Sequence, residues 1–231
     1  MKQWWEHIFG VLGLGLLAVG SYIGLFESPA ALGFGDSVRI MYIHVPTAWL
    51  ALLAFTVAFV CALGWLFQSR WGWDAALEAS IEVGTLMGAL LLVQGSLWGR
   101  TTWGVYWDWD PRLTSSAVLV VSFLGIIALR GFVDDPDQRA RWSSVATILA
   151  YVDVPIVYFS VKWWKTLHQP VSTTQSVDSV LLVPLGLNTF AFLFLGIWFL
   201  ARRWRVAYED RMREVAPPLE AGGPLRTAEG A

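Results

Sequence analysis

Six apolar stretches, each long enough to cross a lipid bilayer, constrain this chain more than any other feature. They cover residues 8–26, 47–68, 79–98, 113–131, 144–161 and 180–201. A helix needs about 20 apolar residues to cross a hydrocarbon core of about 30 Å, and none of the stretches alternates as a membrane barrel strand does. With 56% hydrophobic and 15% charged residues, the sequence predicts an all-α, polytopic membrane protein with six transmembrane helices.

Six crossings put both chain ends on the same side of the membrane. Outside the C-terminal tail, basic residues are evenly divided between the two sides, so the cluster Arg202-Arg203-Trp204-Arg205 decides the orientation. The positive-inside rule then predicts that both termini are cytoplasmic. Residues 27–46, 99–112 and 162–179 are expected to form the outer loops.

The chain divides into a membrane domain, residues 1–205, and a tail, residues 206–231. No small-residue cleavage site follows the first apolar stretch, which therefore reads as a retained helix rather than a signal peptide. Pro217-Pro218, Gly222-Gly223 and scattered charges interrupt the tail. This composition predicts a disordered cytoplasmic segment.

Several classes of function are excluded by what the sequence lacks. It contains no nucleotide-binding P-loop and no basic patch of the nucleic-acid-binding type. Its single cysteine, Cys61, lies inside the second apolar stretch, and there is no C-x-x-C-H motif for covalent haem attachment. No independent catalytic centre is evident, and the outer loops carry the remaining candidates for chemistry.

The expected loop at 99–112, together with the end of the third span, is unusually aromatic. Its rings belong to Trp98, Trp103, Tyr106, Trp107 and Trp109. Tryptophan and tyrosine anchor many membrane proteins at the interface, and this is the simpler interpretation. Here, however, the rings are packed among glycines, a proline and two acids, which favours a platform for a large flat ligand.

Two of the three histidines fall on the same outer side as this loop. His44 precedes Pro46, which is expected to be the first residue of the second helix, and His168 lies in the last outer loop. The partial positive charge of a helix N-terminus keeps a nearby imidazole neutral, as a metal requires. Each histidine alone reads as an interfacial residue. Together they suit haem iron, whose macrocycle supplies four donors, better than structural zinc, which needs four protein ligands.

Haem also carries two propionates that need cationic partners. The basic residues expected on the outer side are Arg39, Arg100, Arg112, Lys162 and Lys165. Arginine is the better partner for a carboxylate because its guanidinium can bond both oxygens. Asp110 can instead hold Arg112 in place, and the sequence leaves both possibilities open.

The segment from Trp103 to Thr114 resembles the W-G-x-x-W-x-W-D-x-R-L-T signature of the WWD family of haem-handling proteins. Six spans, a short chain and one histidine in each flanking loop are most similar to its cytochrome c maturation protein C (CcmC) branch. The resemblance covers nearly the whole chain, from the first span to Trp204. Larger relatives in the family, the haem lyase subunits, have more spans and more functional histidines.

This resemblance implies a protein of the bacterial inner membrane that binds haem b non-covalently and transiently at the periplasmic face. His44 and His168 would be the axial ligands of the iron. The aromatic segment would hold the ring and meet the haem chaperone CcmE, which receives the haem. The small membrane protein CcmD and the ABC transporter CcmA–CcmB would complete the assembly.

Two other functions are open at this point. A b-type membrane cytochrome that transfers electrons would keep its haem and need a second redox centre. A transporter whose tryptophans serve only as anchors would not need the histidines. Asp153, in the middle of the fifth span, is a functional candidate because a charge there is costly, but it can equally bond backbone groups freed by Pro155.

Overall fold

The computed structural model describes residues 4–31, 33–169 and 177–216. Its helices are α1 (Trp4–Tyr22), α2 (Met41–Gln68), α3 (Trp71–Trp103), α4 (Pro111–Phe132), α5 (Pro136–Tyr151), α6 (Asp153–Trp163) and α7 (Ser179–Glu214). A π-helical turn, Ile23–Glu27, extends α1, and a 3-10 turn, Asp36–Ile40, precedes α2. Six segments are long and apolar enough to cross a membrane, with α5 and α6 together forming the fifth. The predicted all-α fold with six spans is confirmed.

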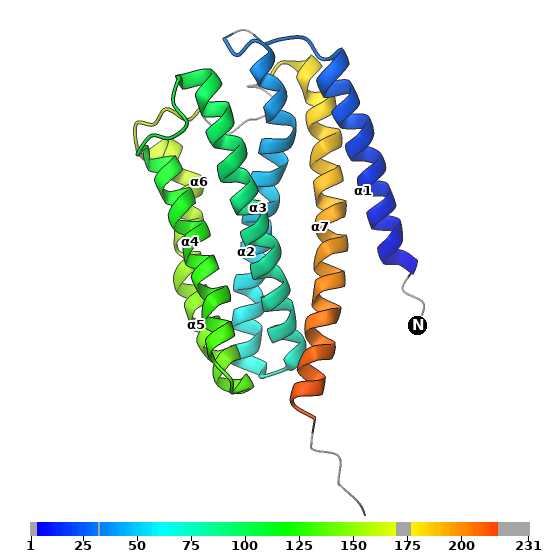
Figure 1. The fold of residues 1–231 in the computed structure, drawn as a ribbon, viewed down its shortest axis with the longest axis vertical. Helices are drawn as coiled ribbons and strands as arrows, with labels where there is room; N and C mark the ends of the chain where they lie inside the picture. The colour runs from blue at the N-terminus through cyan, green and yellow to red at the C-terminus, as the bar shows by residue number, and fades with distance from the viewer. Residues whose placement is uncertain (1–3, 32, 170–176, 217–231) are drawn as a thin grey trace, which may run out of the picture.

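The helices run side by side along the long axis of the molecule (Figure 1). Helix α1 packs along α7 on one side, α2 and α3 form the centre, and α4 packs with α5 and α6 on the other side. The connections before α2, after α3 and before α7 all lie at one end of the bundle, hereafter the loop end. The three expected outer loops therefore meet at one end.

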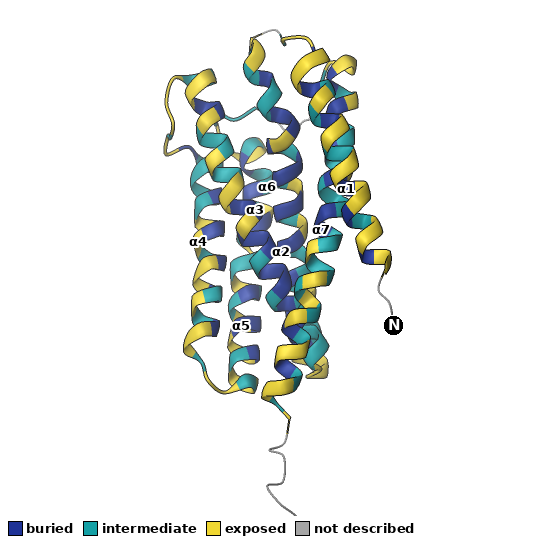
Figure 2. Cartoon of the chain, turned by 45° about the vertical axis from the view of Figure 1, so that its right-hand side comes forward, coloured by how far each residue is buried: buried dark blue, intermediate teal, exposed yellow. Residues whose placement is uncertain are grey.

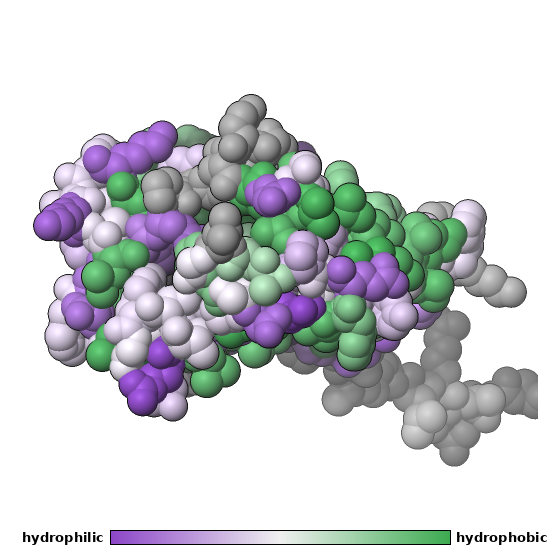
Figure 3. Space-filling model, turned by 90° about the horizontal axis from the view of Figure 1, so that it is seen from above, coloured by the Kyte–Doolittle hydropathy of each residue, from purple (hydrophilic) through white to green (hydrophobic). Residues whose placement is uncertain are grey.

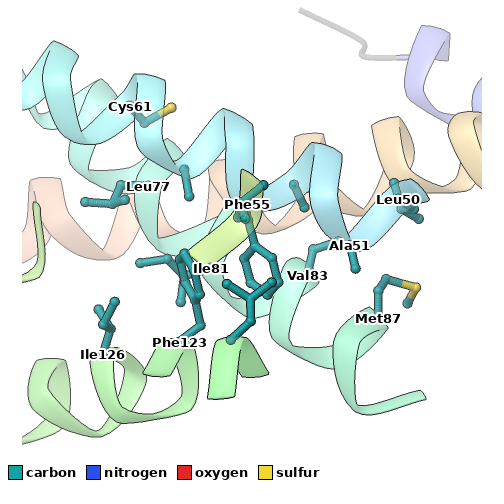
Figure 4. Packing of buried hydrophobic residues seen from close by; sticks show 14 of the residues in the cluster. Leu50, Ala51, Phe55, Cys61, Leu77, Ile81, Val83, Met87, Phe123 and Ile126 are labelled. Carbon is teal, nitrogen blue, oxygen red and sulfur yellow. The ribbon is translucent and has the colours of Figure 1, made fainter. Parts of the chain in front are cut away.

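Apolar side chains from α2, α3, α4 and α6 fill the interior of the bundle. Phe55 of α2 and Phe123 of α4 stack at its centre, with ring centroids 4.0 Å apart, and Leu77 and Ile81 of α3 lie close by (Figure 4). Buried residues face neighbouring helices, whereas the outer faces are exposed (Figure 2). Many exposed residues are large and apolar, such as Leu53 and Val121. Such a surface suits a lipid environment, in which outward-facing apolar side chains need no cover.

The prediction that Pro46 begins the second helix is wrong. Helix α2 begins at Met41, so both His44 and Pro46 lie within it and are buried. Proline has no N–H to donate to the carbonyl four residues earlier, here that of Tyr42. The side chain of Asn188 on α7 supplies the missing donor, with its Nδ2 2.9 Å from that carbonyl oxygen. This tertiary hydrogen bond allows the helix to continue through the proline.

We expect Asn188→Leu to destabilise the protein by about 1–3 kcal/mol, the cost of leaving a buried acceptor unpaired. The substitution preserves much of the side-chain volume but removes the donor to Tyr42. The loss should appear as a lower midpoint of thermal unfolding, followed by circular dichroism in detergent. Thr189→Val, on the adjacent and partly buried position of α7, is the control. Equal stability of Asn188→Leu and the unmodified protein would show that Tyr42 needs no such partner.

The fifth span is broken near its middle. Helix α5 ends at Tyr151 and α6 begins at Asp153, two residues before Pro155. Pro155 cannot donate to the carbonyl of Tyr151, so the regular ladder is interrupted there. Beyond the break, α6 keeps its packing against α4, but its interface with α2 is slight compared with that of α5. The break thus separates α6 from α2 toward the loop end.

The predicted boundary of the tail at residue 205 falls inside a helix. Helix α7 continues to Glu214, so residues 206–214 are helical rather than disordered. The reason is a buried ion-pair cluster at the end opposite the loops, formed by Asp74, Glu78, Arg130 and Arg211. Arg211, near the end of α7, donates to Asp74 at 2.9 Å, which fixes this last part of the helix to α3. Residues 217–231 lie outside the described residues.

Candidate functional site

A cavity lies in the part of the bundle next to the loop end. The space in and around it that holds no atoms is about 1320 Å³, open solvent included. Helices α2, α3, α4 and α6 form its walls, and residues of both the aromatic segment and the last loop also line it. Four helices and two connecting segments thus converge on one concave site.

His44, the fourth residue of α2, lines this cavity. Its ring is 5.5 Å from that of Trp98, measured between centroids, in an edge-to-face arrangement. Gly95 lies against the other side, where a Cβ atom would come within 3.1 Å of the Cε1 atom of His44. The Nδ1 atom is buried and has no hydrogen-bond partner among the described residues. A buried polar atom without a partner is costly and marks a position at which a ligand can compensate.

His168 faces the same cavity from the loop that follows α6. Its Nδ1 atom lies 2.7 Å from the carbonyl oxygen of Gln169, to which it can donate. This contact leaves the lone pair on Nε2 free to coordinate a metal. Burial lowers the pKa of His168 below its ordinary value of 6.5, Arg112 lowers it further, and Gln169 and Asp110 only partly offset these effects. The imidazole is therefore neutral at neutral pH.

The aromatic segment divides into rings that line the cavity and rings that face outward. Trp98, Trp103 and Trp107 line the cavity, and the ring of Trp103 is 6.4 Å from that of His168. Tyr106 and Trp109 are 58% and 80% exposed, respectively.

The loop is also shorter than the predicted range of residues 99–112, because α3 continues to Trp103. Gly104, in the left-handed conformation, ends the helix.

Asp110 has no hydrogen bond to the side chain of Arg112 among the described residues. Its carboxylate instead connects the start of α4 to the loop after α6. Its carboxylate caps α4, accepting from the backbone N–H groups of Arg112 and Leu113, and also accepts from that of Leu167 at 2.7 Å. Burial alone raises its pKa, but these bonds and the Thr166 hydroxyl outweigh burial and leave it below 3.8. The carboxylate therefore stays ionised at neutral pH and ties the loop that carries His168 to the start of α4.

Of the three arginines predicted for the site, only Arg112 is among the residues that line the cavity. Its guanidinium also donates to the carbonyl of Val157 on α6. Arg39 instead binds the carbonyls of Gly24 and Leu25 after α1, together with Asp36. Arg100 binds the carbonyl of Gly104 and lies over the ring of Tyr106. The backbone contacts that occupy Arg39 and Arg100 depend on tertiary structure, which spacing does not reveal.

Several lining residues have no signal in the sequence. Trp49 on α2 and Tyr158 on α6 contact each other in the wall of the cavity, with ring centroids 6.3 Å apart. Each lies in an apolar stretch where it reads as an ordinary lipid-facing aromatic. Gly95 is equally inconspicuous, since its role depends on its contact with His44. Only the three-dimensional packing identifies these residues.

Seen from the loop end, the described residues show a mixture of hydrophilic and hydrophobic side chains (Figure 3). Among the described residues, no group of three or more histidine, cysteine, aspartate or glutamate side chains is placed to hold a metal ion. The cavity instead offers two imidazoles, four indoles and one guanidinium. This donor set fits a large aromatic ligand that brings most of its own metal donors and carries negative charge.

Comparison with known proteins identifies relatives along most of the chain. A family model described as "Heme exporter protein C" matches residues 1–216. The curated "Heme exporter protein C" of Bradyrhizobium diazoefficiens is 42% identical over 79% of this chain and 70% of its own. The proteins of that name from Haemophilus influenzae and Escherichia coli K12 are 39% and 34% identical, over 86% and 87% of this chain and 82% and 83% of their own.

Proposed function

The chain belongs to the heme exporter protein C family, and we propose that it binds haem between His44 and His168 and passes it to a haem chaperone. The haem would be haem b, held without a covalent bond at the periplasmic face of the bacterial inner membrane. One observation carries this proposal: the two histidines line a single cavity with Trp98, Trp103 and Trp107. Haem is the cargo of the protein, and its family is of a transport type rather than an enzymatic one.

The donor set supports haem over a bare metal ion. Two imidazoles are too few for a structural zinc site, which needs four protein ligands. They suffice for haem iron, because the macrocycle provides the other four donors and leaves two axial positions. Indole rings next to the imidazoles supply apolar faces for a porphyrin. Arg112, which lines the cavity, would pair with a propionate. The buried Nε1 of Trp98, which has no partner among the described residues, would donate to another ligand oxygen.

The different settings of the two histidines support transient binding. His44 is fixed within α2, whereas His168 lies in a loop after α6 that is tied to the bundle through Asp110. Loops open at lower cost than packed helices, so release would begin at His168. The recipient would be CcmE, approaching the exposed Tyr106 and Trp109. CcmD and the transporter CcmA–CcmB would be the membrane partners, and both chain termini would be cytoplasmic.

Electron transfer, as in a b-type cytochrome, has less support. Such a protein needs a path from its haem to a second redox centre. The chain has three histidines, and the third, His7, belongs to α1, which does not contribute to the cavity. A second pair of histidine ligands within this chain is therefore excluded.

Haem transfer to the chaperone tests the proposed function. The haem-loaded protein is mixed with the soluble domain of CcmE, and haem on each partner is measured after separation. We expect transfer from the unmodified protein and from Asp108→Ala, which changes an exposed acid of the aromatic segment. His168→Ala should deliver little haem because it retains little. Haem that stays on the protein in the presence of the chaperone would contradict transfer and favour a resident cofactor.

Replacement of Arg112 by glutamine should weaken haem binding by about 10-fold to 100-fold. A hydrogen bond to a charged group is worth about 1.5–3 kcal/mol, and Arg112 is the arginine that lines the cavity. Arg100→Gln is the matched control, because Arg100 lies outside the cavity and should change the affinity less than about twofold. Titration with haemin, followed by absorbance, gives both affinities. Equal losses in the two variants would contradict a direct role of Arg112.

A further inference from the structure

The wall of the cavity between α2 and α6 consists of side chains rather than closely packed helices. On the side of Val152 away from the loop end, α5 packs extensively against α2. On the side toward the loop end, the interface of α6 with α2 is slight. Trp49 from α2 and Tyr158 from α6 meet across this separation in an edge-to-face contact, with centroids 6.3 Å apart. Both residues also line the cavity. Two aromatic rings thus separate the cavity from the outer surface of the bundle.

The exposure of Trp49 locates this wall at the lipid-facing surface. Its side chain is 46% exposed although it lines the cavity. Neighbouring Leu53, one turn along α2, is also exposed, as expected for a helix face in contact with lipid. Rotation of the two rings about their side-chain bonds would open the wall without moving either helix. Exposed side chains change rotamer within nanoseconds, faster than helices move; the side chain of Trp49 is exposed and that of Tyr158 is half-buried.

Residues of the loop end also line the cavity. Phe34, Trp103, Trp107 and His168, which belong to the connections and helix ends there, are among them. The loop that carries His168 is held by the hydrogen bond from Leu167 to Asp110. A ligand that enters from this end would pass these residues, including one of the proposed iron ligands. The route through the side wall leaves them in place.

The lining changes in polarity with depth. Arg112, His168 and Gln169 lie near the loop end, whereas Phe55, Leu119 and Val120 line the inner part. Along α2, Phe55 lies 11 positions after His44, which corresponds to about 16 Å at 1.5 Å per residue. A ligand with a charged edge and an apolar body would have the same orientation in the outer leaflet, with its charged edge at the interface. It could therefore move sideways into the cavity without turning over.

We propose that haem exchanges between the outer leaflet of the bilayer and the cavity through the gap between α2 and α6. This proposal rests on the proposed function. Trp49 and Tyr158 form the movable wall of this route. The occupant of the gap is haem dissolved in the membrane, with its propionates at the headgroup level and its ring among the acyl chains. Arg112, which binds the carbonyl of Val157 on α6, lies next to the route and would receive the propionates as the ring enters.

A reversible crosslink across the gap tests this route. In a Cys61→Ala background, Trp49→Cys and Tyr158→Cys are joined by a reducible bis-maleimide. The apo-protein in phosphatidylcholine vesicles then receives haemin, and the absorbance of bound haem is followed over time. We expect the crosslink to slow loading at least about tenfold, a barrier increase of about 1.4 kcal/mol, with the same final occupancy. Reduction of the linker should restore the rate. Trp142→Cys, labelled on the exposed face of α5, is the control.

Each alternative outcome has a defined meaning. An unchanged loading rate after crosslinking overturns the lateral route and leaves the proposed function standing. A lower final haem occupancy that persists after the linker is reduced also overturns the lateral route. In that case Trp49 and Tyr158 would be needed to hold bound haem rather than form a movable wall. If the unmodified chain and the uncrosslinked variant show no bound-haem spectrum, both the proposed function and the route are wrong.

Discussion

Replacement of Arg130 by methionine should be among the most destabilising single changes in this protein, costing about 3–5 kcal/mol. Arg130 is 9% exposed and binds Asp74 and Glu78 at 2.8 and 2.6 Å. Methionine keeps much of the aliphatic volume but leaves the fully buried Asp74 with Arg211 as its remaining arginine partner. Breaking one half of a buried ion pair leaves an uncompensated charge in a medium of low polarity. Unfolding in mixed micelles, followed by circular dichroism, measures the loss.

Two further variants separate the charge effect from a packing effect. Arg213→Met removes an exposed arginine of the same helix end, paired with Asp210 at 3.5 Å, and should change the stability very little. Combining Arg130→Met with Asp74→Asn should recover part of the loss, because the unpaired charge is then gone. No recovery in the double variant would indicate that Arg130 acts through packing alone.

Asp110→Ala should lower haem affinity about 10-fold to 100-fold while the membrane helices stay intact. Loss of an N-cap costs about 1 kcal/mol, and the N–H of Leu167, which donates to Asp110, loses its partner at a further cost of about 1–3 kcal/mol. The loop carrying His168 would then no longer be held to the start of α4. Haemin titration measures the affinity, and circular dichroism checks the helices.

Asp108 provides the matched control for this prediction. It is an exposed acid two residues away in the same segment, so Asp108→Ala should bind haem as the unmodified protein does. Asp110→Asn should be intermediate, because the amide oxygen can still accept one of the backbone N–H groups. The account of Asp110 as a positioning residue would be wrong if Asp110→Ala and Asp108→Ala had the same affinity.

The sequence predicts the helices better than their ends. Hydropathy alone yields the six spans, because a bilayer leaves few alternatives to a long apolar helix. It places the start of the second helix at Pro46, and the structure corrects this to Met41. The hydrogen bond from Asn188 that accommodates this proline comes from a residue 142 positions later in the chain and has no local signal. The break before Pro155 and the helical extension to Glu214 likewise depend on packing and ion pairing.

The candidate site is only partly visible in the sequence. The grouping of His44 and His168 with the aromatic segment is predictable, because the six spans bring all three to the same end of the bundle. The sequence does not predict which of Arg39, Arg100 and Arg112 lines the cavity, since all three are arginines expected on the same side of the membrane. Trp49 and Tyr158 are equally hidden, because an aromatic residue in an apolar span has no pattern that separates cavity from lipid. Roles that depend on orientation require the folded chain.

The visible absorption spectrum of the haem-loaded protein tests the central claim most directly. The spectrum is recorded for the unmodified protein, His44→Ala, His168→Ala and, as control, His7→Ala on the opposite side of the molecule from the cavity helices α4 and α6. We expect a six-coordinate, low-spin spectrum from the unmodified protein and from His7→Ala. Both other variants should lose haem or shift to a five-coordinate spectrum. Retention of the full six-coordinate spectrum by His44→Ala and His168→Ala would contradict the claim that these two histidines hold the iron.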